Sequence, residues 1–360
     1  GRSRPRDQMQ RSMWLLVQAD DSAECVAKCR DLLDILSEHG AVREGFSSLY
    51  RLSDLPLGSG RSADVFLAGP TTRRSRATGQ PPAEAAAKLL RLGTEGSGAS
   101  QGLEQEVSAF VRVQGHPNVL RFLGLFWLGN AEPRPGSSPW CIASEHCPEG
   151  DLQSLVEREA LVEASARPLF SGILQGLAHI HERGVLHRDM KAANILLKAN
   201  REPVVADFGS SCLASEAAES WGESVVLGRL AHMAPEVVSG KSFSERSDVF
   251  GAGTILFFML SQVLPFAGSS DRSTLKRVQA AYVNFAEFPC FDSGELRAFL
   301  TQVLHRKPAQ RPSAGEALMH PWLQQRSPAV ERTTPGSDTP TAEGGRQALS
   351  PDPDTDEQLM

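Results

Sequence analysis

The sequence predicts an α+β protein of two lobes, a small β-rich lobe followed by a larger α-helical lobe. Strand-like and glycine-containing patterns dominate residues 52–144, and helical patterns dominate from Gly150 to about Gln325. Hydrophobic residues make up 41% of the 360 residues and charged residues 22%, which is typical of a soluble globular protein. A β-rich part followed by an α-rich part also predicts a cleft between the lobes.

The expected elements of the first lobe follow one another closely. We expect a strand, a glycine turn and a second strand over residues 52–68, then a short apolar strand at AAAKLL (85–90). A helix over residues 101–114 follows, and further strands are expected over 119–127 and at WCIAS (140–144). The intervening stretches are rich in Gly, Pro and polar residues, which favours loops.

Composition divides the chain into three parts. Residues 1–49 are expected to be an N-terminal extension with one helix over 21–39, and residues 50–326 form the two-lobed domain. Residues 327–360 lack aromatics, contain five prolines and hold seven acids against two bases, so we expect an acidic disordered tail rich in Pro, Ser and Thr. Most of the net charge of −6 lies there, and this balance does not indicate a nucleic-acid partner.

The longest apolar run without a charge, residues 249–260, is too short to span a bilayer and predicts a buried core helix. The six cysteines are too few and scattered for a disulfide framework, which indicates buried free thiols in a reducing compartment. We therefore expect no membrane span and a cytoplasmic location. The chain starts at Gly1 rather than Met, so a true N-terminus further upstream is compatible with it.

The glycine turn lies in LGSGRSADV (57–65). Gly58 and Gly60, on either side of Ser59, would let the backbone fold closely over phosphates and point N–H groups at them. Ala63 stands where a G-x-G-x-x-G pattern has its third glycine. Taken alone, the pattern favours a plain hairpin turn.

Lys88 lies within the apolar strand EAAAKLL. A buried lysine is costly without an anion, so a phosphate or a carboxylate is expected beside it. The next helix offers Glu104 and Glu106, and we prefer Glu106 because it lies ten residues before HPN (116–118). The alternative is a lysine at the sheet edge that reaches water.

Two further segments carry polar residues suited to phosphate and metal chemistry. In VLHRDMKAAN (185–194), Asp189 can accept a proton, Lys191 can meet a negative charge, and Asn194 can offer an oxygen to a metal. In VVADFG (204–209), Asp207 ends an apolar strand and is a suitable ligand for a hard metal ion. An Asp-x-Gly turn without a metal is the alternative for Asp207.

MAPE (233–236) and the late Arg311 complete the pattern, and a buried Glu236–Arg311 pair would tie the helical lobe together. Asp248 is placed at the start of the apolar helix, as a surface charge or a cap. In this order, the glycine loop, lysine, glutamate, HRD-x-K-x-x-N, DFG, APE and arginine match the signature set of protein kinases. Residues 50–325 therefore resemble a eukaryotic protein kinase catalytic domain, with its two-lobed fold.

The resemblance implies transfer of the γ-phosphate of ATP to a protein hydroxyl with Mg²⁺. It implies that Asp189 accepts the substrate proton, that Lys191 neutralises the transferring phosphate, and that Lys88, held by Glu106, pairs the α- and β-phosphates. Asn194 and Asp207 would hold Mg²⁺. The remaining implied ATP contacts are Gly58, Ser59, Gly60, Val65, Ala86, Glu145, Cys147, Asp151 and Leu196, with Ser144 as the gatekeeper behind the adenine.

Some implied roles leave alternatives open. Asp151 could reach the ribose or cap the next helix. Phe110, Phe122, His187 and Phe208 would stack between the lobes, which makes His187 structural. Lys191 is typical of serine/threonine kinases, and HRDMKAANILL resembles the tyrosine-kinase-like group, whose members mostly phosphorylate Ser/Thr.

The sequence departs from the family pattern in GRLAHMAPE (228–236), where Arg229 replaces the usual threonine and His232 the usual aromatic. The alternative function is therefore an ATP-binding pseudokinase or scaffold. Expected partners are protein substrates with Ser/Thr and an upstream proline-directed kinase. The serines expected to be phosphorylated after DFG are Ser211, Ser215, Ser220 and Ser224, and the proline-directed sites in the tail are Ser327, Thr334, Thr339 and Ser350.

Overall fold

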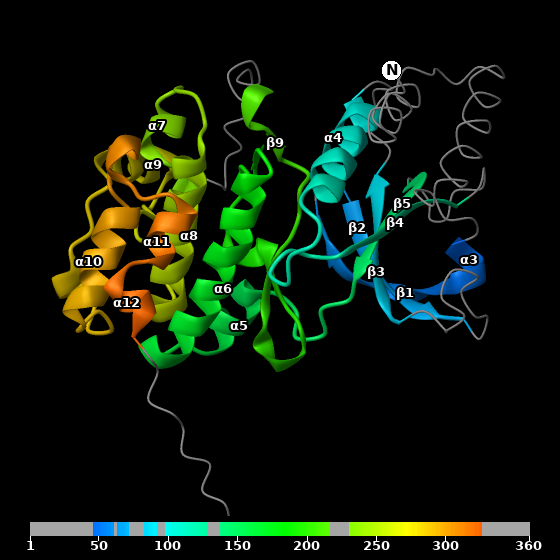
Figure 1. The fold of residues 1–360 in the computed structure, drawn as a ribbon, viewed down its shortest axis with the longest axis horizontal. Helices are drawn as coiled ribbons and strands as arrows, with labels where there is room; N and C mark the ends of the chain where they lie inside the picture. Colours follow the sequence, from blue (N-terminus) through cyan, green and yellow to red (C-terminus); the bar gives the residue numbers. More distant parts are fainter. Residues whose placement is uncertain are drawn as a thin grey trace, which may run out of the picture. The chain divides into compact units, whose positions relative to one another are not determined.

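A computed structural model of the chain describes residues 46–60, 63–71, 83–91, 98–128, 137–216 and 230–325 (Figure 1). The expected helix over residues 21–39, Arg229 and the acidic tail lie outside the described residues. Within the described ranges the chain has the predicted α+β order, with strands first and helices after them.

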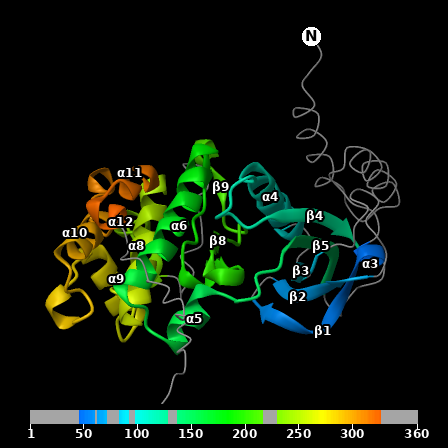
Figure 2. The same cartoon turned by 60° about the horizontal axis from the view of Figure 1, so that its bottom comes forward.

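The N-terminal lobe is a five-stranded antiparallel sheet in the order β1-β2-β3-β5-β4. Its strands are β1 (Tyr50–Ser59), β2 (Ala63–Pro70), β3 (Ala85–Arg91), β4 (Phe122–Trp127) and β5 (Ser137–Glu145). Two helices accompany it, α3 (Phe46–Leu49) beside β1 and α4 (Gly98–Arg112) between β3 and β4 in the chain (Figure 2). Among the described residues, the predicted strands and the predicted helix of this lobe are confirmed, but the helix covers 98–112 instead of 101–114 and the strand expected over 119–127 begins at Phe122.

Side chains of β3 alternate between the two faces of the sheet, as strand geometry requires. Ala85, Ala87 and Leu89 are buried in a small core with Phe46 and Phe126. The aromatic rings of that core meet at 5.4 Å between Phe46 and Phe126. Lys88 therefore lies on the opposite face of the sheet.

The C-terminal lobe is mainly helical. Its helices are α5 (Leu152–Arg158), α6 (Glu163–Glu182), α7 (Pro235–Val238), α8 (Glu245–Ser261), α9 (Asp271–Ala280), α10 (Gly294–Val303), α11 (Ala314–Leu318) and α12 (Pro321–Gln324). Two short antiparallel pairs join β6 (Val185–Leu186) to β9 (Cys212–Leu213) and β7 (Ile195–Leu197) to β8 (Pro203–Val205). Single 3₁₀ turns are η1 (Ala192–Asn194), η2 (Ala199–Arg201), η3 (Ala214–Glu216), η4 (Leu230–His232), η5 (Phe285–Glu287) and η6 (Pro308–Gln310).

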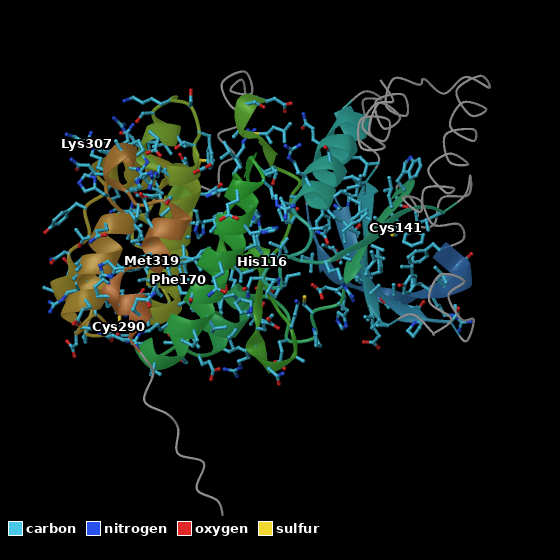
Figure 3. All side chains as sticks on the ribbon, viewed as in Figure 1. His116, Cys141, Phe170, Cys290, Lys307 and Met319 are labelled. Atoms are coloured by element: carbon cyan, nitrogen blue, oxygen red, sulfur yellow. The ribbon has the colours of Figure 1, made fainter. Side chains whose placement is uncertain are left out.

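Helix α8 is buried on all sides, which confirms the core helix predicted from the apolar run 249–260. It begins at a capping box in which Ser244 and Ser247 exchange side-chain and backbone hydrogen bonds. Helix α6 packs against it and carries Phe170, which is fully buried (Figure 3). The short strands and loops of the lobe pack against these two helices.

Among the described residues, no helix combines the length and apolar character that crossing a bilayer would require. The described cysteines are all free thiols, and Cys141 and Cys147 are buried as predicted. The prediction is wrong for Cys290, which is exposed because it falls in the loop between η5 and α10 (Figure 3), and Cys212 is only half-buried. Cys25 and Cys29 lie outside the described residues.

Candidate active site

Lys88 is the point at which three segments of the chain meet. Its Nζ atom lies 2.6 Å from Oε1 of Glu106 on α4 and 3.0 Å from Oδ1 of Asp207, which follows β8. The side chain of Lys88 is 21% exposed, and that of Glu106 is 7% exposed. The expected carboxylate partner is therefore Glu106, and Lys88 is not a lysine that merely reaches water.

The three charges shift one another's protonation. Burial opposes the ammonium of Lys88, but Glu106 and Asp207 outweigh it and raise its pKa above the ordinary value. Burial raises the pKa of Glu106, whereas contact with Lys88 overcomes burial at Asp207 and lowers its pKa to about 2. Two carboxylates around one ammonium leave an excess of negative charge, which suits a divalent cation.

The catalytic-loop residues Asp189, Lys191 and Asn194 converge on one carboxylate oxygen. Oδ2 of Asp189 accepts from Lys191 Nζ at 2.9 Å and from Asn194 Nδ2 at 2.9 Å. Nδ2 of Asn194 also donates to the backbone carbonyl of Asp189 at 2.7 Å. Because Asp189 holds the NH₂ end of this amide, the oxygen end faces elsewhere and is the atom that could bind a cation.

The backbone of this loop is held by Asp248 at the start of α8. Its Oδ1 accepts from the N–H of Arg188 and its Oδ2 from the N–H of His187, each at 2.9 Å. Oδ2 also lies 3.0 Å from Nε2 of His181 on α6. Arg188 has a φ of 66°, which is strained for a residue with a side chain. Asp248 therefore holds the turn before Asp189 in place, a role that the sequence analysis missed.

His187 also connects the segment that contains Asp189 with the segment that contains Asp207. Its Nε2 donates to the carbonyl of Ala206 at 2.9 Å, and its Nδ1 accepts from the N–H of Asp189 at 3.3 Å. Ala206 in turn donates its N–H to the carbonyl of Asn194 at 2.9 Å. His187 is fully buried, and its contacts with backbone groups favour the expected structural role.

A chain of aromatic rings connects these segments to the sheet. Phe122 on β4 lies 5.3 Å from Phe110 on α4, and Phe110 lies 5.1 Å from Phe208. Phe208 then lies 5.4 Å from His187, which completes the predicted stack. The stack therefore sets the position of α4, and with it Glu106, relative to Asp207.

Asn194 and Asp207 are the residues that could hold a metal ion. No group of three or more His, Cys, Asp or Glu side chains suited to a metal occurs among the residues that the structure describes. Magnesium in nucleotide sites is commonly held by one or two protein oxygens together with phosphate and water. An amide oxygen and a carboxylate of low pKa fit that requirement.

The residues expected around the nucleotide form two rows across the sheet. In one row, Gly58 pairs with Val65 and Val65 with Lys88. In the other, Ala86 on β3 pairs with Ser144 on β5. Ser59 ends β1 next to these rows.

The glycine turn and the segment after β5 add two details. The N–H of Gly60 donates to the carbonyl of Ala63 at 2.8 Å, so this donor closes the hairpin instead of pointing outward as expected. Glu145 ends β5, and Cys147 is buried two residues later. Burial, together with nearby Glu145, raises the pKa of the Cys147 thiol to about 12.

Asp151 and Leu196 belong to the helical lobe and form an isolated bridge with each other. The Asp151 carboxylate caps α5, because Oδ1 accepts from the N–H of Ser154 and Oδ2 from its hydroxyl, both at 2.8 Å. This favours the capping alternative for Asp151 over the ribose contact.

The segment after DFG corrects one expectation. Ser211 is 4% exposed and its hydroxyl donates to the carbonyl of His187, so it is not accessible for phosphorylation. Its burial follows from its place directly before β9, which pairs with β6. Ser215 is exposed in η3, whereas Ser220 and Ser224 lie outside the described residues.

Comparison with known proteins agrees with this geometry. Residues 53–323 match the family described as "Protein kinase domain". CBL-interacting protein kinase 28 of Oryza sativa subsp. japonica is 31% identical over 241 residues, which cover 66% of this chain and 51% of that protein. Serine/threonine-protein kinase PEPKR2 of Arabidopsis thaliana is 32% identical over 242 residues, which cover 67% and 48%. The chain spans about half the length of the curated relatives it matches.

Proposed function

The chain belongs to the protein kinase domain family, and we propose that it transfers the γ-phosphate of ATP to serine or threonine hydroxyls of proteins with Mg²⁺. The observation that carries this proposal is the contact of Lys88 with both Glu106 and Asp207. It brings the lysine proposed to pair the nucleotide phosphates and the acid proposed to bind the metal to within 3.0 Å of each other.

The proposed reaction assigns one task to each residue. Asp189 orients the substrate hydroxyl and takes its proton as the hydroxyl oxygen bonds to the γ-phosphorus. The bond between that phosphorus and the β–γ bridging oxygen breaks, and ADP leaves with the electron pair. Lys191, at 2.9 Å from Asp189, offsets negative charge on the transferring phosphoryl group. A bound Mg²⁺ would neutralise phosphate charge, held by Asn194 and Asp207.

Two observations support the serine/threonine class. Lys191 lies two residues after Asp189, as the resemblance requires for that class. Relatives such as PEPKR2 carry serine/threonine-protein kinase in their names. We propose a cytoplasmic location and protein substrates with Ser/Thr as partners, with the Ser-Pro and Thr-Pro sites of residues 327–360 as targets of an upstream kinase.

The scaffold alternative is less well supported by the geometry. A protein that only binds nucleotide has no need for a base at the substrate side of the site. Here Asp189 is 7% exposed, and Lys191, Asn194 and the backbone anchors of Asp248 all hold it in place. Because several residues hold the Asp189 carboxylate in position, we favour phosphotransfer over the scaffold alternative.

The test measures phosphate transfer from Mg-ATP to a generic basic protein. We expect wild type to transfer phosphate, and Lys88→Met, Asp189→Asn and Asp207→Ala to lose about 100-fold or more in rate while they remain folded. Asp292→Asn, in an exposed loop of the helical lobe, is the matched control and should retain the wild-type rate.

Two outcomes would contradict this scheme. If Asp189→Asn kept more than about a tenth of the wild-type rate, Asp189 would not be the base. If wild type bound Mg-ATP but transferred no phosphate, the scaffold alternative would replace the proposed function.

A further inference from the structure

Lys198, which directly follows β7, reaches from the helical lobe to two segments that precede it in the chain. Its Nζ donates to the carbonyl of Pro117 at 2.9 Å. The same atom lies 3.5 Å from Oε1 of Glu145, the last residue of β5. One ammonium therefore connects the turn after α4, the end of β5 and the strand β7.

Glu145 is fixed by Arg121 as well as by Lys198. Its N–H donates to the carbonyl of Arg121 at 2.9 Å, and its Oε1 accepts from the N–H of Arg121 at 2.9 Å. The side chain of Glu145 is only 15% exposed. A carboxylate that has lost most of its contact with water is stabilised by a neighbouring cation, and Lys198 is the cation beside it.

The turn that Lys198 contacts is itself rigidly attached to the helical lobe. Nδ2 of Asn118 donates to the carbonyl of Pro203 at 2.8 Å. Val205 donates its N–H to the carbonyl of Asn118 at 2.9 Å, and Leu120 donates to the carbonyl of Val205 at 3.0 Å. Lys198 thus ties the end of β5 to a fixed part of the structure.

The segment held in this way is the one proposed to contact adenine. Ser144 lies directly before Glu145, and Cys147, two residues after Glu145, is buried. Without the ammonium, the Glu145 carboxylate would be more stable if it turned toward water. The end of β5 would then shift with it. The position of residues 145–147 therefore depends on a residue that lies outside the proposed ATP contacts.

We propose that Lys198 is a positioning residue for nucleotide binding, which holds residues 145–147 in the conformation that receives adenine. This inference rests on the proposed function and adds a residue to its binding site. Under this inference, Lys198 differs from a surface lysine whose loss would leave nucleotide binding unchanged. The nearby pair of Arg201 and Glu159 is such a surface pair, with atoms 3.1 Å apart and side chains 52% and 53% exposed.

The test measures the dissociation constant of Mg-ATP directly and the rate of phosphate transfer separately. We expect Lys198→Met to weaken Mg-ATP binding about three- to tenfold, as loss of one half-buried ion pair predicts. The transfer rate at saturating ATP should stay near the wild-type value, and Lys198→Arg should restore most of the affinity. Arg201→Met, which removes an exposed cation three residues away, is the matched control and should bind like wild type.

A double-mutant cycle locates the effect. In a Glu145→Gln background, Lys198→Met should weaken binding less than it does in wild type, because the carboxylate that needs the cation is gone. Equal Mg-ATP affinities for wild type and Lys198→Met would overturn the inference and leave the proposed function standing, as would equal losses in Lys198→Met and Arg201→Met. Failure of wild type to bind Mg-ATP would overturn both.

Discussion

The Nδ1 atom of His232 lies 3.0 Å from the hydroxyl oxygen of Thr254 on α8. The hydroxyl of Thr254 donates its own hydrogen to the carbonyl of Gly251 at 2.7 Å. It can therefore only accept from His232, so the neutral imidazole must carry its proton on Nδ1. This bond fastens η4, the turn before APE, to the central helix of the lobe.

The same turn of α8 supports the catalytic loop. A Cβ atom added to Gly251 would lie 2.9 Å from Cβ of Met190, and Met190 lies between Asp189 and Lys191. The loop that contains Asp189 and Lys191 and the turn η4 therefore both contact the same turn of α8. We interpret His232, which stands where the family usually has an aromatic residue, as the half-buried partner of the buried Thr254 in a polar pair.

The first prediction tests this pair through protein stability. Thr254→Val keeps the shape of the side chain but leaves the N–H of His232 without its acceptor, and we expect it to lower the free energy of unfolding by about 1–3 kcal/mol. In a His232→Phe background the same change should cost almost nothing, since no donor is left unsatisfied. Urea unfolding of the four proteins measures both values, and equal costs in the two backgrounds would show that the hydrogen bond does not form.

The second prediction concerns pH. Burial lowers the pKa of His232 to about 4, although Asp189 opposes this shift and Lys191 adds to it. In the unfolded chain the pKa of this histidine is its ordinary value of 6.5, so protonation favours unfolding between the two pKa values. The free energy of unfolding should therefore fall as the pH decreases from about 6.5 to 4, by up to about 1.4 kcal/mol per pH unit from this group.

Burial also lowers the pKa of His116 and of His320, so they act in the same direction as His232. His232→Phe should for this reason reduce the dependence on pH without abolishing it. Unfolding in urea at pH 7, 6 and 5 provides the comparison. The neutral state assigned to His232 would be wrong if wild type and His232→Phe lost equal stability over this range.

Much of the site could be predicted because the motifs carry chemistry that is recognisable one residue at a time. A lysine within an apolar strand favours an anion beside it, and the place of Glu106 ten residues before HPN (116–118) singles it out from Glu104. The aromatic stack and the Glu236–Arg311 pair followed from the family resemblance and from the cost of leaving a charge buried. These features depend on residue type more than on exact backbone conformation.

The features that sequence reasoning missed depend on backbone groups far apart in the chain. Asp248 accepts from N–H groups about 60 residues earlier, one of them in the left-handed conformation of Arg188. Ser211 is buried because β9 pairs with β6, and Lys198 meets a carbonyl 81 residues away. No local pattern reports such contacts, although an acid at the head of a wholly apolar helix was a signal that Asp248 has a buried partner.

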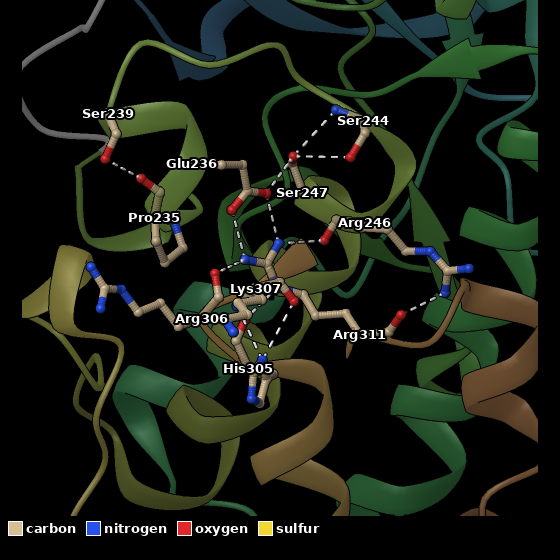
Figure 4. A network of polar contacts seen from close by, with 10 residues as sticks. All are labelled: Pro235, Glu236, Ser239, Ser244, Arg246, Ser247, His305, Arg306, Lys307 and Arg311. Carbon is tan, nitrogen blue, oxygen red and sulfur yellow. Dashed lines mark hydrogen bonds and ion pairs between the residues drawn. The ribbon is translucent and has the colours of Figure 1, made fainter. Parts of the chain in front are cut away.

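The third prediction concerns the buried pair of Arg311 and Glu236 (Figure 4). Nη1 and Nη2 of Arg311 donate to the two carboxylate oxygens of Glu236 at 2.7 and 2.6 Å, and Arg311 is 2% exposed. Arg311→Met would leave the carboxylate buried without its cation, so we expect a loss of about 3–5 kcal/mol in the free energy of unfolding. Arg306→Met removes an equal charge from an exposed side chain and should cost less than about 0.5 kcal/mol. Similar losses in both variants would mean that net charge, and not the buried pair, decides the outcome.

The last prediction tests the assignment of Ser144 as the gatekeeper. Ser144 is 9% exposed and pairs across the sheet with the small Ala86 on one side and with Phe122 on the other. A serine here leaves room behind the proposed adenine position, so a pyrazolopyrimidine with a bulky aryl group should bind the unmodified protein. Burial of such a ring removes about 100 Å² from water, worth roughly 2–3 kcal/mol or about a hundredfold in affinity.

Ser144→Met should fill that space and remove most of this gain, whereas Ser144→Ala should keep it, because alanine is as small as serine. Dissociation constants of the inhibitor for the three proteins decide the question, and those of Mg-ATP serve as the control for an intact site. If wild type and Ser144→Met bound the inhibitor equally well, Ser144 would not lie behind the nucleotide. Residues 145–147 would then not be the segment that receives adenine, because their assignment and that of Ser144 rest on the same alignment.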